Sequence, residues 1–267
     1  MNILVFNEIF SENASILSAQ TNIDIISDFE AIENHTYIIY GAHEVALNLY
    51  MIQKEHKVKY IILNSESEQS DFLRNKFYIT LLKNNYVFNY SKYNSNYLLN
   101  ALKISTYGFY NFEFKIINKE KEREFKIGFI GKENKRRLNI LSDLSKTNKC
   151  YIDFNNKNMN PNNMKHTLLN CEWLVNIPYY THKNFEQHRV NNALSCGCKV
   201  VSLCESMDEE TRKLYEPYIY ITDDLTKFFN KIPDEPKLKY IDLINNEKWI
   251  DTNNFNNWMF KKIKSNI

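Results

Sequence analysis

Two clusters of charged residues in this sequence have the types and spacing needed to bind an anion. In the first, Gly131 follows an apolar run and leads into Lys132, Lys135, Arg136 and Arg137. A glycine turn after a strand, with cations at the start of a helix, suits a diphosphate, because free helix amides and basic side chains point the same way. The alternative is a solvated basic helix turn, and Gly131 fits either interpretation.

The second cluster opens the segment 186–202, which reads EQHRVNNALSCGCKVVS. Helical spacing places Arg189 on one face with both Glu186 and Asn192. An apolar helix face follows, Gly197 is suited to end the helix, and a β-branched strand comes next. The Glu186–Arg189 pair is therefore either a surface ion pair or part of a ligand site where a helix begins beside a sheet.

His43, Asn64 and Glu66 are the polar residues of interest in the first half. His43 follows one predicted strand, and Asn64 and Glu66 follow the next one along the chain. Side chains at the carboxyl ends of parallel strands are where α/β sheets bind their ligands. His43 and Glu66 are thus candidates for catalysis, although a lone histidine is more often structural.

The sequence lacks the motifs of several other kinds of binding or catalytic site. There is no GxGxxG and no P-loop, and with five glycines in the chain both dinucleotide and P-loop readings are poor. No Asp-x-Asp metal motif follows a strand, and no Ser-His-Asp or Cys-His arrangement is found. The five cysteines include Cys196 and Cys198 in one turn, a pattern that favours buried free thiols over a metal site.

An alternation of apolar strands and amphipathic helices must position these residues. We predict strands at 3–6, 24–26, 36–40, 59–63, 86–90, 125–130, 150–154, 173–177, 199–202 and 218–221. Helices are expected between them, including one continuous helix over 71–84. This order predicts parallel sheets with helices on both faces, an α/β fold.

The polar stretch 111–124 divides the chain. Its Lys-Glu run predicts a solvated connector, so we expect an N-terminal domain over 1–115 and a C-terminal domain over 125–235. The remaining 236–267 are expected to be helical. The aromatic residues of this tail require a docking surface: Trp249, Phe255, Trp258 and Phe260.

The net charge and the hydropathy of the chain argue against nucleic acid and membranes as partners. The 267 residues carry a net charge of +2, which is too balanced to support a nucleic-acid groove. No apolar run approaches the roughly 20 residues of a membrane span, and the first residues do not resemble a signal peptide. We therefore expect a cytoplasmic protein without a membrane span.

Taken together, these features resemble glycosyltransferases of the GT-B type, similar to families 1 and 4. The segment 186–202 is similar to their donor-site helix and strand, which often read R-x-x-E-A-x-x-x-G before an apolar strand. The segments 61–66 (IILNSE) and 86–94 (YVFNYSKYN) look like a subgroup found in large DNA viruses and some bacteria. A viral source would place the protein in the host cytoplasm.

The resemblance implies two Rossmann-like domains facing across a cleft, closed by the C-terminal helical segment. It implies a hexosyltransferase-like enzyme that moves a sugar from a nucleotide-sugar donor to a glycan, protein or other hydroxyl acceptor. The donor is a cosubstrate, and neither a cofactor nor a metal ion is expected, since basic residues replace the cation. The implied donor-binding residues are Gly131, Lys135, Arg136, Glu186, Arg189 and Asn192. His43 and Glu66 would serve the acceptor, with His43 as general base if the enzyme inverts.

The chain departs from the family pattern at Asn192, where many relatives have a glutamate that binds the nucleotide ribose. An amide can bond a hydroxyl, but without the charge. This departure keeps open a second hypothesis, a catalytically inactive GT-B-fold module that binds a nucleotide or a glycan. A third, a transferase acting on a hydroxylated base of nucleic acid, has little support from the net charge.

Overall fold

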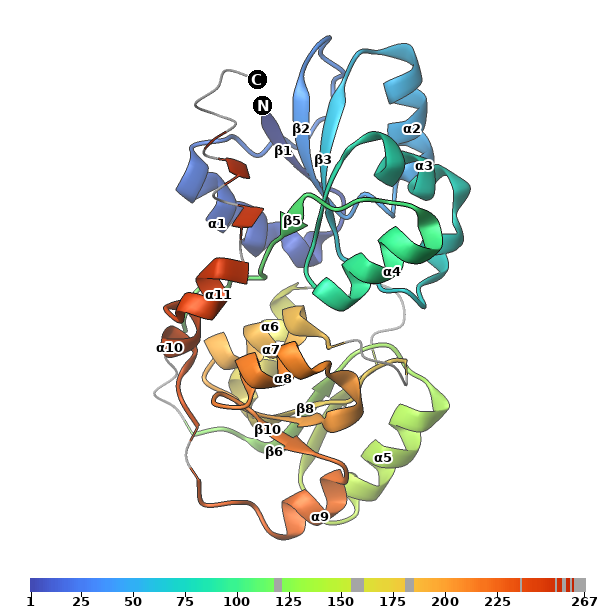
Figure 1. Cartoon of the computed structure of the whole chain (residues 1–267). Helices are drawn as coiled ribbons and strands as arrows, with labels where there is room; N and C mark the ends of the chain where they lie inside the picture. The colour runs from blue at the N-terminus through green and yellow to red at the C-terminus, as the bar shows by residue number, and fades with distance from the viewer. Residues whose placement is uncertain are drawn as a thin grey trace. The chain divides into compact units, whose positions relative to one another are not determined.

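The computed structural model describes residues 1–117, 122–154, 161–180, 185–235, 237–252, 254–255, 258–259 and 261. The chain divides into two compact units: unit 1 comprises Met1–Phe112 and Ile250–Ile267, and unit 2 comprises Glu113–Trp249. Each unit contains a five-stranded parallel sheet, and the described chain has 11 α-helices (Figure 1). The fold is a Rossmann-like α/β fold, as the strand–helix alternation predicts.

Unit 1 consists of alternating strands and helices in chain order. They are β1 (Asn2–Val5), α1 (Ser11–Thr21), β2 (Thr36–Tyr40), α2 (Ala46–Glu55), β3 (Lys59–Asn64), α3 (Lys76–Asn84), β4 (Tyr86–Asn89), α4 (Lys92–Leu102) and β5 (Gly108–Phe109). Short 3₁₀ turns lie at Glu8–Phe10 and Asp71–Arg74.

The strand order of this sheet reverses at β1. The five strands lie in the order β1-β2-β3-β4-β5, and all pairs are parallel. Ile25 forms a single bridge with Ile3, while β1 also pairs with β2, so the chain passes to one side of β1 and then returns to the other. The carboxyl ends of β1 and β2 therefore flank a topological switch point, the usual ligand position of such sheets.

Alternation along the strands builds the core of unit 1. One face of the sheet presents Leu4, Ile39 and Ile62, which pack with Leu49 of α2 and Leu81 of α3. Their neighbours in sequence point to the opposite face, because successive side chains of a strand alternate. Burial on both faces explains why these strands read as continuous apolar runs.

Unit 2 repeats the same alternation. It contains β6 (Phe125–Ile130), α5 (Lys135–Ser145), β7 (Cys150–Asp153), α6 (Pro161–Asn170), β8 (Cys171–Asn176), α7 (Gln187–Ser195), β9 (Lys199–Leu203), α8 (Glu209–Tyr215), β10 (Tyr220–Thr222), α9 (Leu225–Asn230) and α10 (Tyr240–Ile244). Gly197, with φ of +70°, follows the end of α7, as its predicted role requires.

The second sheet also has a switch point. Its order is β10-β9-β8-β6-β7, so β7 lies on one side of β6 and β8 on the other. The carboxyl ends of β6 and β8, near Gly131 and Ile177, flank it. Helices α6 and α7 contact β6, β8 and β9, and α5 and α9 belong to the core built on Phe129, Trp173 and Val201.

The aromatic residues of the C-terminal tail are divided between the two units. Trp249 is buried in unit 2 with its ring centroid 6.2 Å from that of Tyr215. Phe255 and Trp258 belong to unit 1 and contact Phe88, with centroid distances of 4.8 and 5.0 Å. Helix α11 (Glu247–Thr252) spans the boundary between the units, and Phe260 lies outside the described residues.

The structure corrects three expectations and adds two elements. The predicted strand 24–26 is a single bridge at Ile25, and Asn75 interrupts the predicted helix 71–84 because its side chain caps a new helix, α3. The added elements are β5 and α8, which the sequence pattern did not predict. The stretch 111–124 is not wholly a solvated connector, since Phe112 and Phe114 are buried. Its residues 118–121 lie outside the described residues, as do residues 155–160.

None of the helices in the described part of the chain combines the length and apolar character needed to cross a membrane.

Candidate functional site

The switch point of unit 2 is tied together by the first turn of α5. Asn134 caps this helix by accepting from the backbone nitrogen of Arg137 at 2.8 Å. Three side chains then donate to three successive carbonyl oxygens after β8: Asn134 to Tyr179 at 2.9 Å, Arg136 to Pro178 at 3.0 Å, and Arg137 to Ile177 at 2.9 Å from Nε and 2.6 Å from Nη2. The loop after β6 and the loop after β8 are thereby fixed to each other.

Two buried guanidinium groups share one carboxylate at this switch point. Arg137, 1% exposed, contacts Oε1 of Glu186 through Nη2 at 2.9 Å. Arg189, 9% exposed, contacts Oε2 of Glu186 and donates to Oδ1 of Asn176 at 3.3 Å. Both guanidiniums also lie over the ring of Phe129, at 5.2 and 5.4 Å. The predicted Glu186–Arg189 pair is formed, but at a buried site rather than on the surface.

Gly131 lies directly against this pair. A Cβ atom at this position would come within 2.7 Å of Nη2 of Arg189 and 3.1 Å of Nη1 of Arg137. Only glycine leaves the guanidiniums this close to the turn after β6. The glycine therefore allows the close approach of two charged groups to the turn after β6.

The electrostatics of the pair are unfavourable without a further anion. Burial lowers the pKa of Arg189 well below its ordinary value, and the charge of Arg137 lowers it further. Burial also lowers the pKa of Arg137 to about 10. Two like charges out of water are costly, and a single carboxylate compensates only one of them.

The other predicted donor residues lie in different surroundings. Lys135 is exposed on the first turn of α5. Arg136 forms an ion pair with Glu205. Asn192 is 4% exposed, and its Nδ2 lies 3.0 Å from the sulfur of Met164. The structure thus brings Gly131, Glu186 and Arg189 together, whereas the amide nitrogen of Asn192 contacts Met164 of α6.

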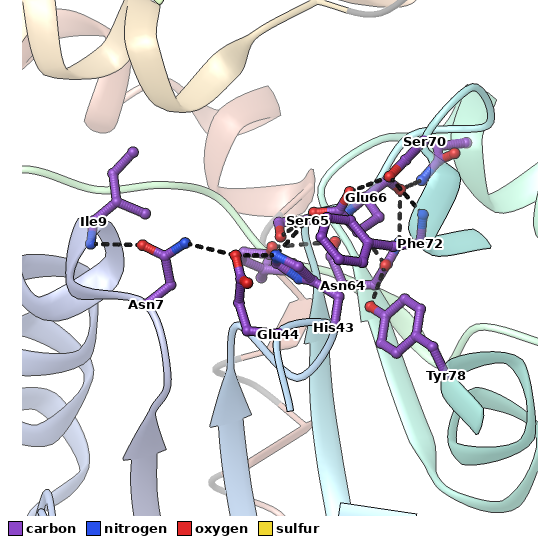
Figure 2. A network of polar contacts seen from close by, with 12 residues as sticks. Asn7, Ile9, His43, Glu44, Asn64, Ser65, Glu66, Ser70, Phe72 and Tyr78 are labelled. Carbon is purple, nitrogen blue, oxygen red and sulfur yellow. Dashed lines mark hydrogen bonds and ion pairs between the residues drawn. The ribbon is translucent and has the colours of Figure 1, made fainter. Parts of the chain in front are cut away.

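His43 lies at the switch point of unit 1, between two carboxylates. Its Nε2 is 3.3 Å from Oε1 of Glu44 and 3.3 Å from Oε1 of Glu66 (Figure 2). Asn7, which follows β1, donates to Glu44 at 3.2 Å. His43 is 7% exposed and the Glu66 side chain is 16% exposed. The structure therefore brings the two predicted catalytic residues into contact, and each follows the carboxyl end of a strand.

Asn64 fixes the backbone of Glu66. Its Oδ1 accepts from the Glu66 backbone nitrogen at 3.2 Å and from the Tyr78 hydroxyl at 2.7 Å, and its Nδ2 donates to the Glu66 carbonyl at 3.0 Å (Figure 2). Asn94 donates to the same carbonyl at 2.6 Å, and Ser70 donates to the Glu66 carboxylate. Asn64 is thus a positioning residue, and the carboxylate of Glu66 remains directed at His43.

Buried tyrosines surround this cluster. Burial raises the pKa of Tyr78 well above its ordinary value, and the charge of Glu66 raises it further. Burial likewise raises the pKa of Tyr110, whose hydroxyl donates to the Asn64 carbonyl at 3.2 Å. These hydroxyls are therefore neutral donors that hold the end of β3.

Sequence reasoning missed Asn7, Asn134 and Asn176, and it named Arg137 among the cations of the first cluster without predicting its burial. A signal for Arg137 existed, because it lies four and seven residues before Leu141 and Leu144, on the buried face of α5. Asn7 follows an apolar strand and Asn176 ends one, as His43 and Glu66 do. A polar residue at the carboxyl end of an apolar strand was the common signal.

Within the described ranges, no group of three or more His, Cys, Asp or Glu side chains is arranged to hold a metal ion.

Comparison of the chain with protein-family models, and with curated proteins, found no match.

Proposed function

We propose that this chain is a glycosyltransferase that moves a sugar from a nucleotide-sugar donor to a hydroxyl acceptor without a metal ion. Unit 2 holds the diphosphate of the donor at the switch point between β6 and β8. Unit 1 supplies the base for the acceptor hydroxyl. The sugar-transferase resemblance of segment 186–202 and the chemistry of the two switch points support the same function.

One observation carries the proposal: Arg137 and Arg189 are buried beside Gly131 and share a single carboxylate. Their charge exceeds that of their protein partner, at the position where α/β sheets bind anions. Helix α5 begins next to Gly131, and a helix N-terminus attracts phosphate. A diphosphate supplies the negative charge that this arrangement lacks.

These groups would act on the departing nucleotide. Charge develops on the diphosphate as its bond to the sugar breaks, and fixed guanidiniums stabilise that charge without reorganisation. Arginine offers a planar pair of donors to phosphate oxygens, so it can do the work that a divalent cation does elsewhere. Arg136 and Lys135, on the same turn, add to the positive field.

His43 and Glu66 would act on the acceptor. A base takes the proton of the attacking hydroxyl. Nε2 of His43 lies against two carboxylates, which can only accept from it. The other ring nitrogen, Nδ1, is therefore the atom that would take the proton in an inverting reaction. Glu66 orients the imidazole and stabilises it once it has accepted the proton. In a retaining reaction the same pair would bind acceptor hydroxyls.

A second function, an inactive module that binds a nucleotide or a glycan, is favoured by one observation. Asn192 replaces the glutamate expected for the ribose, and its amide nitrogen contacts the sulfur of Met164 rather than open solvent. Under this alternative the arginine pair binds a diphosphate and no sugar is transferred.

Incubation with a panel of nucleotide sugars in the presence of EDTA tests the proposal. We expect hydrolysis or transfer with at least one donor, and Arg189→Ala should lower kcat by roughly 10²–10³-fold. Arg212→Ala, at an exposed position of α8, is the matched control and should retain full turnover. Binding of nucleoside diphosphates without turnover of any donor would select the inactive module, and unimpaired turnover by Arg189→Ala would remove that residue from the site.

A further inference from the structure

Glu186 is the only carboxylate on the buried arginine pair in the described structure. Each of its oxygens contacts one guanidinium, Oε1 with Arg137 and Oε2 with Arg189. The other hydrogen-bond partners of the two arginines are neutral: Lys132 and Ile177 carbonyl oxygens, and the Asn176 amide oxygen. Among the described residues, one positive charge of the pair is therefore left without a counter-charge.

Arg189 has donors to spare. Within the described part of the chain, its hydrogen bonds all leave from Nη1, so Nε and Nη2 have no acceptor. This side chain is nine-tenths buried, and its Nη2 lies beside the position where Gly131 has no side chain. A buried guanidinium with an unused edge is suited to bind an oxyanion through two parallel hydrogen bonds.

Glu186 is the outermost and least constrained member of this cluster. Its side chain is 20% exposed, against 1% for Arg137 and 10% for Arg189. It stands at the N-cap position of α7, yet its side chain makes no capping hydrogen bond. The carboxylate can therefore leave the arginines without uncapping the helix.

We propose that the Glu186 carboxylate is a displaceable counterion, which occupies the arginine pair until a phosphoryl group of the ligand replaces it. A diphosphate carries more charge than a carboxylate and presents more acceptor oxygens, so it compensates both arginines and uses the free edge of Arg189. The exchange needs no new cation and leaves the carbonyl contacts of Arg137 in place. The inference rests on the proposed function only for the identity of the natural anion.

The exchange has a measurable consequence. In the wild-type protein, an incoming anion must break two ion pairs and meets the negative charge of Glu186. Glu186→Gln removes both obstacles and preserves the side-chain shape. The variant should bind inorganic pyrophosphate roughly tenfold or more tightly than the wild type does, because close charge pairs couple by this amount or more.

Glu172→Gln is a matched control, because Glu172 also lies between two cations in unit 2. Its carboxylate contacts Lys126 at 2.8 Å and Lys199 at 3.3 Å, near the amino ends of β6, β8 and β9. The substitution makes the same change in net charge at the opposite edge of the sheet. Its affinity for pyrophosphate should equal that of the wild type.

Calorimetric titration of inorganic pyrophosphate into the wild type, Glu186→Gln and Glu172→Gln, with EDTA present, tests the proposal. Inorganic phosphate serves as the second probe and distinguishes a single phosphoryl site from a diphosphate site. Tighter binding by Glu186→Gln alone supports displacement. Equal or weaker binding by Glu186→Gln, or no binding by any of the three proteins, overturns it.

A shorter carboxylate keeps the test valid if Glu186→Gln does not fold. Glu186→Asp retains the charge but is one methylene too short to span both arginines, so it should also bind pyrophosphate more tightly, by a smaller factor. Unchanged affinity in this variant counts against displacement. The proposed function fails separately: tighter pyrophosphate binding with no turnover of any nucleotide sugar leaves the counterion exchange intact and removes the transferase.

Discussion

The side-chain nitrogen of Asn192 lies 3.0 Å from the sulfur of Met164, so α7 directs this amide toward α6. Arg189, one turn earlier on the same helix, contacts Glu186 and Asn176 instead. Asn192 and Arg189, which helical spacing places on one face, therefore contact different parts of the unit. The relationship separates the arginine pair from Asn192, the residue that the proposed function would place at the ribose.

We predict that Asn192→Ala changes nucleoside diphosphate affinity much less than Arg189→Ala. The amide is 4% exposed and lies against a thioether, whereas Nε and Nη2 of Arg189 have no acceptor among the described residues. Calorimetry with a nucleoside diphosphate measures both variants against the wild type. Equal losses in the two variants would mean that Met164 moves aside and that Asn192 reaches the ribose in the complex.

Replacement of Arg137 should destabilise unit 2. Its guanidinium donates to the carbonyl oxygens of Ile177 and Lys132, and Arg137→Met leaves both without these donors. Buried acceptors that lose their donors cost about 1–3 kcal/mol each, so we expect a loss of about 3 kcal/mol in the free energy of unfolding. Urea denaturation followed by tryptophan fluorescence measures this loss, because Trp173 and Trp249 belong to unit 2.

Arg212→Met is the control for this stability measurement. Arg212 is exposed on α8, and surface changes of this kind stay within about 0.5 kcal/mol. A similar midpoint for Arg137→Met and Arg212→Met would show that water replaces the lost donors at Ile177 and Lys132.

The strands were predictable from the sequence where both of their faces are buried. Strands such as β3 lie in the middle of a sheet and are apolar on both faces, so their sequences are continuous apolar runs. β5 pairs over only two residues, Gly108 and Phe109, and such a length gives no periodic signal. The opposite error occurred at 24–26. The apolar pair Ile25-Ile26 predicted a strand, but only Ile25 forms a bridge, with Ile3 of β1.

The site was predictable in part. His43, Glu66 and Gly131 were found because each follows the end of an apolar strand. Arg137 was named in the basic cluster with a diphosphate site and a solvated helix turn both left open, although its spacing to Leu141 indicates the buried face of α5. Asn192 was placed with Arg189 by spacing alone, but almost all of α7 is buried, so residues one turn apart meet different elements.

Loss of the base should slow transfer more than it weakens binding. His43→Gln keeps a hydrogen-bonding side chain but cannot take a proton, so we predict that kcat for sugar transfer falls by roughly 10²–10⁴-fold with little change in donor KM. Glu44→Gln changes the other carboxylate that contacts Nε2, and this side chain is 41% exposed, so its effect should be smaller. Equal kcat values for His43→Gln and the wild type would exclude His43 as the base, and a retaining mechanism would then be favoured.

The buried tyrosines predict a specific loss of stability at high pH. The raised pKa of Tyr78 means that the folded state holds its proton more tightly than the unfolded state, which titrates near its ordinary value of 10.0. The stability that this group contributes is present below pH 10 and is lost as the pH rises. At pH 11 the loss is about 1.4 kcal/mol for each such tyrosine.

Tyr78→Phe isolates this contribution. At pH 8 the variant should be about 1 kcal/mol less stable than the wild type, because Asn64 loses the Tyr78 hydroxyl as a donor. At pH 11 the difference should vanish or reverse, since phenylalanine has no proton to lose. Urea midpoints at the two pH values measure it, with Tyr107→Phe, at a ring that is 54% exposed, as control. A difference for Tyr78→Phe that stays constant between pH 8 and pH 11 would show that the Tyr78 hydroxyl ionises as readily in the folded chain as in the unfolded one.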